Sequence, residues 1–480
     1  MTELEIKEQE NKKLLEALSH LEEINDPIDD SLYKQFDVKR GLRYADGRGV
    51  LVGLTRIGDV VGYELDSEGK KVAVPGKLIY RGYNIEDIVK DCVAHNQFGF
   101  EQCVYLLLFG ELPTHTQLKR FTEFLGEYRG LPENFTEDMI MKAPSCNIMN
   151  KIARGVLASY SYDENPEDRS IQNILRQCLE LISRFSTLAA YGYQAKRRYF
   201  DGKSLYIHNP KPELSTAENF LRLIRSDKSY TRLEAEILDL ALVLHAEHGG
   251  GNNSSLTVHV VSSADTDTYS AIAAAVGSLK GHRHGGANIR VIEMMDDIKV
   301  NVKDWSNETE VADYLRKIAT KQAFDHTGLI YGLGHAVYTI SDPRAILLRN
   351  KAKELAEEKG CMKEFNLYTL IERIAPNILY ELHGDGKRIC TNVDFYSGFV
   401  YSMLNIPREL FTPLFAIARI AGWSAHRIEE IVAGGRIYRP AYKNVSGERE
   451  YIPIDDRVEC TEKRTTPQKS DEVETSGPSD

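Results

Sequence analysis

The sequence lacks any apolar run that approaches the ~20 residues a bilayer-spanning helix needs. Its seven cysteines form no CxxC pair and leave an odd number, which favours a reducing compartment over a disulfide framework. An excess of basic residues is missing too: the formal net charge is -11, whereas nucleic-acid affinity comes from clustered Lys and Arg. The first two dozen residues are rich in Glu and have no apolar segment of the signal-peptide type. We therefore expect a cytoplasmic protein without membrane or nucleic-acid partners.

The composition is that of a folded globular protein, with 42% hydrophobic and 27% charged residues. A chain of 480 residues exceeds the size at which one hydrophobic core usually stops growing. Two domains, or one domain with large appendages, are therefore expected.

Strand-like patterns are confined to the N-terminal part, over residues 50–63 and 71–74, with turn-forming residues 66–69 between them. Asn84 then has the character of a helix N-cap. From there to about Arg349 nearly every segment repeats apolar residues with a period of 3.6. The sequence thus predicts a predominantly helical, all-α fold with a short N-terminal β-hairpin region.

The two ends of the chain differ from this pattern. Residues 2–25 carry four leucines at helical spacing among many charges, namely Leu14, Leu15, Leu18 and Leu21. They indicate an amphipathic helix or a solvated extension. After about Val458 the residues are Thr, Ser, Glu, Pro and Lys with few apolar side chains, which predicts a disordered tail.

A pair of histidines ends one of the predicted helices. The Ala-rich pattern of residues 271–279 leads to Gly281, His282, Arg283 and His284, and two glycines follow. Glycines let a ligand or another backbone come close, and an imidazole exchanges protons near neutral pH. A helix C-cap with surface histidines explains the same stretch equally well.

A second pair, His245 and His248, follows the apolar helical pattern of residues 233–244. With Glu247 the two could ligate zinc. The HExxH spacing is absent, however, which favours hydrogen-bonding histidines over a metal site. The three glycines at 249–251 lack the Lys-Ser/Thr and the preceding strand of a phosphate loop.

Three further positions could carry chemistry. His335 follows a Gly-x-Gly, where an exposed imidazole on a turn is the simpler explanation of this motif taken alone. Asp394 lies between Val393 and Phe395, which could desolvate it and make it a stronger base, although a helix N-cap would explain it as well. Arg419 sits in an apolar helical run, and a buried Arg needs an anionic partner.

Taken in this order, the motifs resemble the citrate synthase family. HAEHGGGNNSS, HRHGGAN and GLGHAVYTISDPR are similar to its three histidine motifs, and NVDFYSG to its aspartate motif. The arginine helix FAIARIAGW, the terminal IYRP and the segment YRGYNIEDI match as well. The resemblance covers roughly Val50 to Tyr442, and the six ordered motifs other than YRGYNIEDI do not coincide readily by chance.

The resemblance implies a catalytic role for three of these residues. Asp394 would remove a proton from the methyl group of an acyl-CoA thioester. His284 would hydrogen-bond the thioester carbonyl as it becomes an enol or enolate, a contact that is typically worth ~3 to 4 kcal/mol. His335 would polarise the ketone of oxaloacetate.

The same resemblance implies how the second substrate binds. Arg344, Arg419 and Arg439 would hold the two carboxylates of oxaloacetate, since guanidinium groups pair with them bidentately. His248 would add a hydrogen bond, with His245 as a supporting neighbour. In the family, the arginine that matches Arg439 comes from the second subunit, so a homodimer is expected.

For CoA, the resemblance implies contacts from the backbone of a loop to the adenine: Leu329, Ile330, Tyr331, Gly332, Leu333 and Gly334. The CoA thioester is a substrate, and no cofactor or metal is expected. His282 would be a bystander. Ala336 stands where many members have Arg, which leaves the CoA-phosphate contacts open.

The expected domains are a helical arm over 1–35, a large domain over 36–286 and 401–457, a small domain over 287–400, and the tail over 458–480. In the family the small domain closes on the large one to exclude water.

The expected enzyme is an acyltransferase of the citrate (Si)-synthase type from the tricarboxylic acid cycle, using acetyl-CoA. Two alternatives stay open at this point. A 2-methylcitrate synthase would use propionyl-CoA, since one methylene in an apolar pocket is worth only ~1 to 3 kcal/mol. A non-catalytic relative would merely bind CoA or carboxylates.

Overall fold

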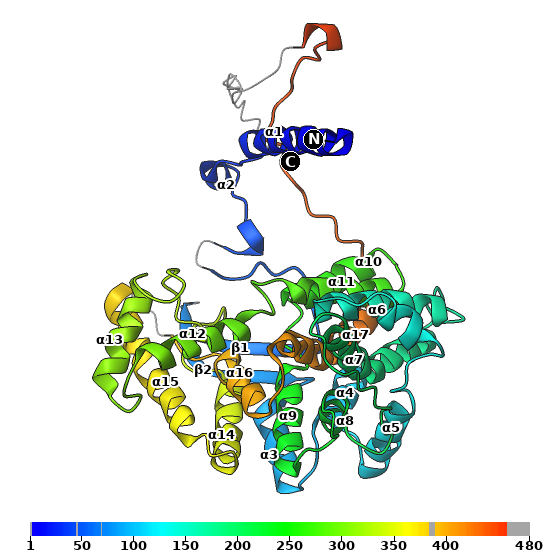
Figure 1. Cartoon of the computed structure of the whole chain (residues 1–480), viewed down its shortest axis with the longest axis vertical. Helices are drawn as coiled ribbons and strands as arrows, with labels where there is room; N and C mark the ends of the chain where they lie inside the picture. Colours follow the sequence, from blue (N-terminus) through cyan, green and yellow to red (C-terminus); the bar gives the residue numbers. More distant parts are fainter. Residues whose placement is uncertain (1, 45–46, 69, 384–388, 458–480) are drawn as a thin grey trace. The chain divides into compact units, whose positions relative to one another are not determined.

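The computed structural model describes residues 2–44, 47–68, 70–383 and 389–457, and these residues form 17 α-helices and one small sheet (Figure 1). The prediction of an all-α fold is confirmed. By its internal contacts the chain divides into two compact units, Val52–Arg439 and a unit made of Met1–Leu51 with Pro440–Asp480. In the described chain, no helix has the length and apolar character required to cross a membrane.

The smaller unit contains helices α1 (Glu3–Asn25) and α2 (Asp30–Gln35) and the 3-10 turns Arg40–Leu42 and Ile454–Asp456. A capping box starts α1: the Thr2 side chain accepts from the Glu5 backbone, and the Glu5 carboxylate accepts from the Thr2 backbone. The leucines of α1 are exposed. The predicted disordered tail, 458–480, lies outside the described residues.

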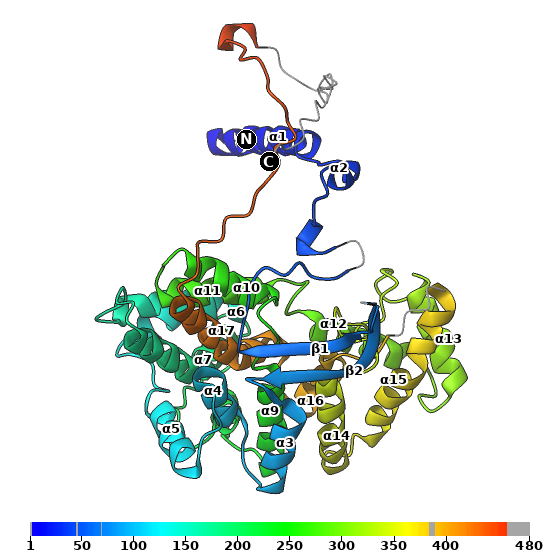
Figure 2. The ribbon, with the colours of Figure 1, turned by 180° about the vertical axis from the view of Figure 1, so that it is seen from behind.

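A three-stranded antiparallel sheet, in the order β1-β2-β3, opens the larger unit (Figure 2). Its strands are β1 (Gly58–Leu65), β2 (Lys71–Tyr80) and β3 (Tyr83–Asn84). The predicted hairpin is therefore present, but the first strand was wrongly expected to begin at Val50. The backbone N–H of Arg56 and the hydroxyl of Thr55 donate instead to the Glu429 carboxylate, so this segment is bonded to a helix rather than to a strand.

The remaining helices of the larger unit begin with α3 (Ile85–Ala94), whose first turn is capped by the Asn84 side chain as predicted. The others are α4 (Phe100–Phe109), α5 (His115–Glu127), α6 (Ile148–Ser159), α7 (Ile171–Tyr199), α8 (Thr216–Ile224), α9 (Arg232–His245), α10 (Asn253–Ser263), α11 (Thr268–Lys280), α12 (Ala287–Asn301), α13 (Glu308–Ala319), α14 (Pro343–Glu358), α15 (Met362–His383), α16 (Val393–Met403) and α17 (Phe411–Ala433).

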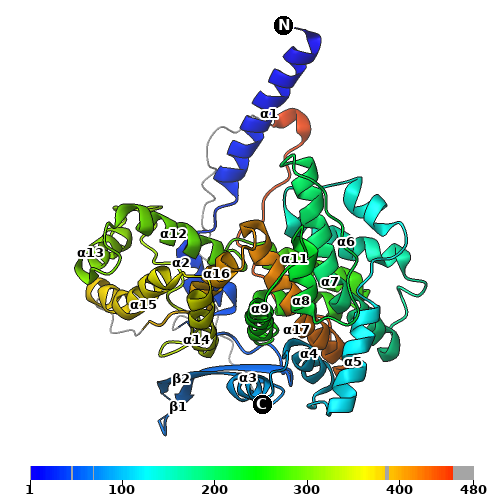
Figure 3. The ribbon, with the colours of Figure 1, turned by 60° about the horizontal axis from the view of Figure 1, so that its bottom comes forward.

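Helix α17 runs through the middle of the core. Every residue from Phe411 to Arg427 is buried, and the helix packs against α4, α7, α9, α10 and α11 (Figure 3). A helix that is buried on all sides is expected to be apolar all round. The charged residues on α17 therefore need an explanation in terms of function.

Helices α12 to α16 lie together at one side of this core (Figure 1). Helices α12 and α14 pack against α16, α13 packs against α15, and α14 also contacts α9 of the central group. These helices fall within the predicted small domain, 287–400; the domain boundaries stay a prediction.

Candidate active site

The short segment after α9 presents His248. The Nε2 atom of His248 is buried and has no hydrogen-bond partner among the residues the structure describes. Burial lowers the pKa of this imidazole well below its ordinary value, and the nearby Arg344, His335 and Arg419 lower it further. His248 is thus neutral at physiological pH, with an unused polar atom.

His335 lies beside it, with the two ring centroids 5.1 Å apart. The backbone N–H groups of Val337 and Tyr338 both donate to Nδ1 of His335, each over 3.1 Å. Because Nδ1 accepts, the ring proton must be on Nε2. The imidazole also stacks on the Tyr338 ring at 4.6 Å. His335 is therefore fixed as a neutral ring that can donate through Nε2.

Arg344 is 3% exposed and is held by a carboxylate of its own helix end. Asp342 is the N-cap of α14, with Pro343 next, an arrangement favoured at helix starts. The guanidinium donates from Nε and Nη2 to the two Asp342 oxygens, over 3.0 and 2.8 Å. Asp342 outweighs burial and raises the pKa of Arg344. The Asp342 carboxylate also accepts from the backbone N–H of Val393, and this hydrogen bond joins α14 to the start of α16.

Arg419 on α17 is fully buried and has no such carboxylate contact. Its Nε donates to the His245 carbonyl over 2.7 Å, while Nη1 and Nη2 are buried without partners in the described chain. Burial lowers the pKa of Arg419 to about 10, so the group stays charged at neutral pH. A buried cation with two unpaired donors is costly unless an anion binds there.

Asp394 occupies the first turn of α16, but it does not cap the helix. The cap is Asn392, whose side chain accepts from the Asp394 backbone over 3.0 Å, so the interpretation of Asp394 as an N-cap is wrong. No hydrogen bond to its carboxylate is formed within the described residues. Burial raises its pKa to about 6, against the lowering effects of Arg344 and Arg419. It is a base that is ionised at neutral pH and stronger than an ordinary carboxylate.

His284 follows the C-cap of α11 at Gly281. Its Nε2 lies 3.1 Å from the Ser254 hydroxyl oxygen, which also accepts from Trp423 Nε1. Burial, with a smaller contribution from Arg419, lowers the pKa of His284 to about 4. His284 is therefore neutral, whereas His282 two residues earlier is exposed.

The glycine after His284 is required by packing. A Cβ atom at Gly285 would lie 2.3 Å from the Leu279 carbonyl oxygen and 2.9 Å from Thr412 of α17. The sequence analysis allowed either a ligand or another backbone to lie close to this glycine. In the structure it is another backbone, that of Leu279.

The loop 329–334 joins His335 to the segment that carries Asp394. Gly332 and Gly334 have positive φ angles of 82° and 86°, a region that favours glycine. Leu333 forms a β-bridge with Thr391, and the side chain of Asn392 donates to the Gly334 carbonyl. Leu329 is exposed, while Ile330 is buried. Part of this backbone thus aligns the segment of His335 with the segment of Asp394.

Arg439 is the predicted site residue that the structure does not connect to the others. It is exposed, and its guanidinium forms no hydrogen bond or ion pair within the described part of the chain. The loop 329–334 aside, the remaining predicted site residues influence one another through the ring contacts and the effects on pKa given above. They are His248, His284, His335, Arg344, Asp394 and Arg419.

Two residues near the site were not singled out from the sequence as site residues. Asp342 pairs with Arg344, and the Asp-Pro pair at a helix start was a usable signal for its position. His426 on α17 bonds to Glu247. The sequence signal for His426 was its position seven residues after Arg419, which places both side chains on one face of a helix.

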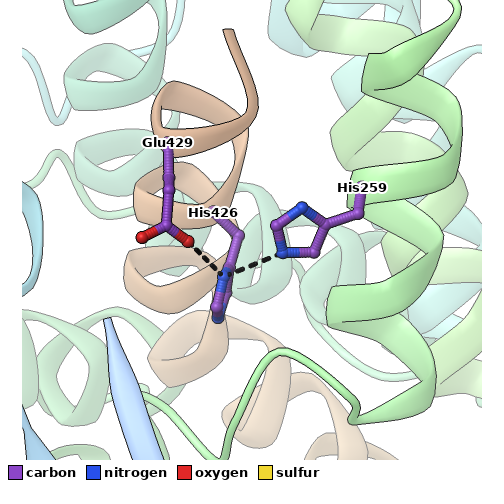
Figure 4. Close-up of side chains that lie close together, drawn as sticks. All are labelled: His259, His426 and Glu429. Atoms are coloured by element: carbon purple, nitrogen blue, oxygen red, sulfur yellow. Dashed lines mark hydrogen bonds and ion pairs between the residues drawn. The ribbon is translucent and has the colours of Figure 1, made fainter. Parts of the chain in front are cut away.

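Side chains of the types that can hold a metal ion gather at a different place from the histidine motif considered above. Of the described residues, His259, His426 and Glu429 form the group whose ligand atoms all lie within 4.8 Å of one another (Figure 4). His245 instead stacks on Phe415 at 4.3 Å. His245, Glu247 and His248 therefore do not form such a group.

Comparisons with known proteins find similar sequences over most of the chain. Residues 41–441 match the family model described as citrate synthase, C-terminal domain. The chain is 33% identical to citrate synthase of Haloferax volcanii, over 88% of this chain and 99% of that protein. It is 32% identical to 2-methylcitrate synthase 1 of Corynebacterium glutamicum, over 82% and 95%.

A solved structure is similar as well. It is the ternary complex of carboxymethyl coenzyme A and oxaloacetate with citrate synthase from Thermoplasma acidophilum. It superposes with a TM-score of 0.69 at 26% identity, covering 88% of this chain and 99% of that one.

Proposed function

The chain belongs to the citrate synthase family, and from this we propose that it condenses acetyl-CoA with oxaloacetate and hydrolyses the resulting citryl-CoA to citrate and CoA. One observation carries the proposal. The carboxylate of Asp394, with its pKa raised to about 6 and no structural hydrogen bond within the described chain, is close enough to two buried arginines for each to shift its pKa. A base beside an anion-binding site is what the condensation requires.

In the proposed reaction Asp394 accepts a proton from the thioester methyl group. We propose that Nδ1 of His284 carries the ring proton and hydrogen-bonds the thioester carbonyl. Its Nε2 then faces the Ser254 hydroxyl over 3.1 Å, and Oδ1 of Asn252 is a second acceptor for the single proton of that hydroxyl. A neutral imidazole suits this role, and the low pKa of His284 supports it. The enol carbon formed in this way is the nucleophile.

The second substrate is proposed to lie against Arg419, Arg344 and His248, whose polar atoms suit a small dianion. His335 donates from Nε2 to the ketone oxygen while the enol carbon attacks the carbonyl carbon. Water then cleaves the thioester of citryl-CoA. The CoA thioester is a substrate in this scheme, and the chemistry requires neither a metal nor a redox cofactor.

We further propose that the protein is a homodimer in which Arg439 binds oxaloacetate in the partner's site. Its exposure supports this role. The loop 329–334 is proposed to contact the adenine of CoA, and residues 287–400 to close over the bound substrates.

The assay that tests the function measures release of the CoA thiol from acetyl-CoA and oxaloacetate. We expect turnover that is lost in an Asp394→Ala variant, while that variant still binds oxaloacetate. Absence of thiol release with any acyl-CoA would instead support a non-catalytic relative.

The second candidate is a 2-methylcitrate synthase, favoured by the nearly equal identity to the relative of that name. Comparing kcat/KM for acetyl-CoA and propionyl-CoA separates the two. A clear preference for propionyl-CoA would replace citrate synthase by this alternative.

A further inference from the structure

The turn formed by residues 245–249 is fixed by one face of α17. Arg419, Gly422 and His426 lie at i, i+3 and i+7, and so on the same side of that helix. Arg419 donates to the first carbonyl of the turn over 2.7 Å, and the Gly422 backbone donates to the second over 3.2 Å. Nε2 of His426 lies 3.1 Å from Oε1 of Glu247, the third residue. Three successive residues of the turn are therefore bonded to three positions of one helix face.

Glu247 has almost no space to move. A Cβ atom at Gly422 would lie 2.2 Å from its Oε2, and one at Gly58 would lie 2.7 Å from its Cγ. Oε1 also accepts from the Gly249 backbone over 2.5 Å. Oε2 is buried without a partner in the described chain.

The protons around His426 can be assigned from its neighbours (Figure 4). The Glu430 carboxylate lies 2.7 Å from Nδ1 of His259, and Nε2 of His259 lies 3.1 Å from Nδ1 of His426. The carboxylates of Glu430 and Glu247 can only accept hydrogen bonds. The ring nitrogens that face them, Nδ1 of His259 and Nε2 of His426, therefore carry protons. Glu429 lies 3.7 Å from Nδ1 of His426, which places the proton between the rings on His426.

His426 is therefore an imidazolium and His259 is neutral. The groups that face His426 are Glu247 from the turn, Glu429 from its own helix and His259 from α10. Burial opposes the charge, but the two carboxylates outweigh it and raise the pKa of His426 to about 9. The pKa of His259 is lowered, first by burial and then by His426.

Glu247 also acts on Arg419, since its charge opposes the effect of burial on that guanidinium. Both groups have unpaired buried atoms, Oε2 on Glu247 and the two Nη atoms on Arg419. After His426, Arg419 is the cation that lowers the pKa of Glu247 most. Without the positive charge of His426, Glu247 would therefore compete with any anionic ligand for Arg419.

We propose that His426 is a positioning residue for the dianionic substrate: it binds the Glu247 carboxylate as an imidazolium, and this keeps the Nη atoms of Arg419 and the Nε2 atom of His248 available to the ligand. The identity of the ligand as oxaloacetate rests on the proposed function. A zinc ion on His259, His426 and Glu429 is the competing explanation of the same cluster.

The experiment compares four proteins, the wild type and the variants His426→Gln, Glu247→Gln and the two combined. In His426→Gln we expect the KM for oxaloacetate to rise about tenfold or more while the KM for acyl-CoA changes by less than about twofold, because the loss concerns the binding of one substrate. Adding Glu247→Gln should recover part of that loss, since the competing charge is gone and the two residues act as a unit. His115→Gln, at an exposed histidine, is the matched control and should change neither KM.

Equal KM values for oxaloacetate in wild type and His426→Gln, or strictly additive effects in the combined variant, would overturn the proposal. Should His426→Gln fail to fold, the wild type is compared with Glu247→Gln. The KM of the wild type for oxaloacetate should rise between pH 8 and pH 10 as His426, with its pKa of about 9, loses its charge. This rise should exceed the one in Glu247→Gln, because Arg419, with its pKa of about 10, loses charge in both proteins. A flat profile there contradicts the proposal.

Titration calorimetry with oxaloacetate separates this proposal from the proposed function. If the wild type binds oxaloacetate but releases no CoA thiol, the function fails and the affinities of the four proteins still decide the role of His426. If it binds no oxaloacetate, both fail. Stoichiometric zinc in the purified wild type that is lost in the His426→Gln variant would also overturn the proton assignment.

Discussion

Arg344 and Arg419 are both buried, and they are close enough for Arg344 to lower the pKa of Arg419, yet they obtain their hydrogen bonds in different ways. Arg344 uses Nε and Nη2 on the carboxylate of Asp342, two residues away in sequence. Arg419 uses only Nε, on a backbone carbonyl, and its Nη atoms have no partners among the described residues. Accordingly the pKa of Arg344 is raised, while that of Arg419 is lowered to about 10.

The difference separates a guanidinium that already has a carboxylate of the protein as its partner from one whose Nη atoms are left for a ligand. Arg344 has its charge balanced within the protein, and Asp342 also bonds to the start of α16. Arg419 has a carboxylate, Glu247, close by but turned to His426 instead. The protein thus keeps one guanidinium unsatisfied, which is the arrangement expected for binding an anion.

The largest expected effect concerns Asp394, the anion that both arginines influence. Asp394→Ala should lower kcat by roughly 10²- to 10⁴-fold, the usual contribution of a general base. The affinity for oxaloacetate should stay within a few-fold, because Arg419 and Arg344 remain. Steady-state kinetics and calorimetry check both parts, and a near-normal kcat would show that Asp394 is not the base.

Removing each arginine tests the comparison itself. Arg344→Leu leaves Asp342 as an uncompensated buried charge, so the free energy of unfolding without ligand should fall by about 3–5 kcal/mol. Arg419→Leu removes an unsatisfied buried cation and should change it by less than about 1 kcal/mol. Urea denaturation at equal protein concentration measures both values.

Addition of oxaloacetate then sharpens the contrast. A saturating concentration should stabilise the wild type against urea, as any ligand that binds only the folded state does, but should not stabilise Arg419→Leu. Equal losses of stability in the two variants without ligand would mean that the arginines do not differ in the way described.

The sequence could predict the features of the site that depend on neighbouring residues, but not those that depend on segments far apart in the chain. The helical periods predicted the all-α fold, and the local residue pattern predicted the cap at Asn84. The motifs identified the candidate site residues through the family resemblance. Whether Asp394 is a cap or a base could not be decided locally, because the answer depends on which side chain, Asn392 or Asp394, turns to the helix end.

The sequence could not predict contacts between segments that lie far apart in the chain. Nothing in the sequence near Glu247 indicates that His426, 179 positions later, lies beside it. The start of β1 was missed for the same reason, since Glu429 of α17 takes the backbone N–H of Arg56. Such pairs follow from tertiary packing, which periodicity and propensity do not determine.

The two arginines also predict a shift in the pH profile. Burial raises the pKa of Asp394 to about 6, so kcat/KM should be level above that pH and fall about tenfold per unit below it, as the carboxyl group becomes protonated and ceases to act as a base. Arg344 opposes this rise more than Arg419 does. Arg344→Gln should therefore move the acidic limb to higher pH by more than Arg419→Gln, and the opposite order would contradict the assigned electrostatics.

The smallest effect is expected at Ser254, whose hydroxyl lies between His284 and Trp423. Ser254→Ala removes the hydroxyl that lies 3.1 Å from Nε2 of His284 and that donates to Oδ1 of Asn252 over 2.9 Å. Because a neutral hydrogen bond contributes about 1 kcal/mol, kcat should fall roughly fivefold, with the KM for oxaloacetate unchanged. Ser255→Ala is the matched control, because the hydroxyl of Ser255 is buried without a partner in the described chain and its loss should leave kcat unchanged. If the two variants behave alike, Ser254 does not orient His284, and the proton on that imidazole is set by the bound thioester itself.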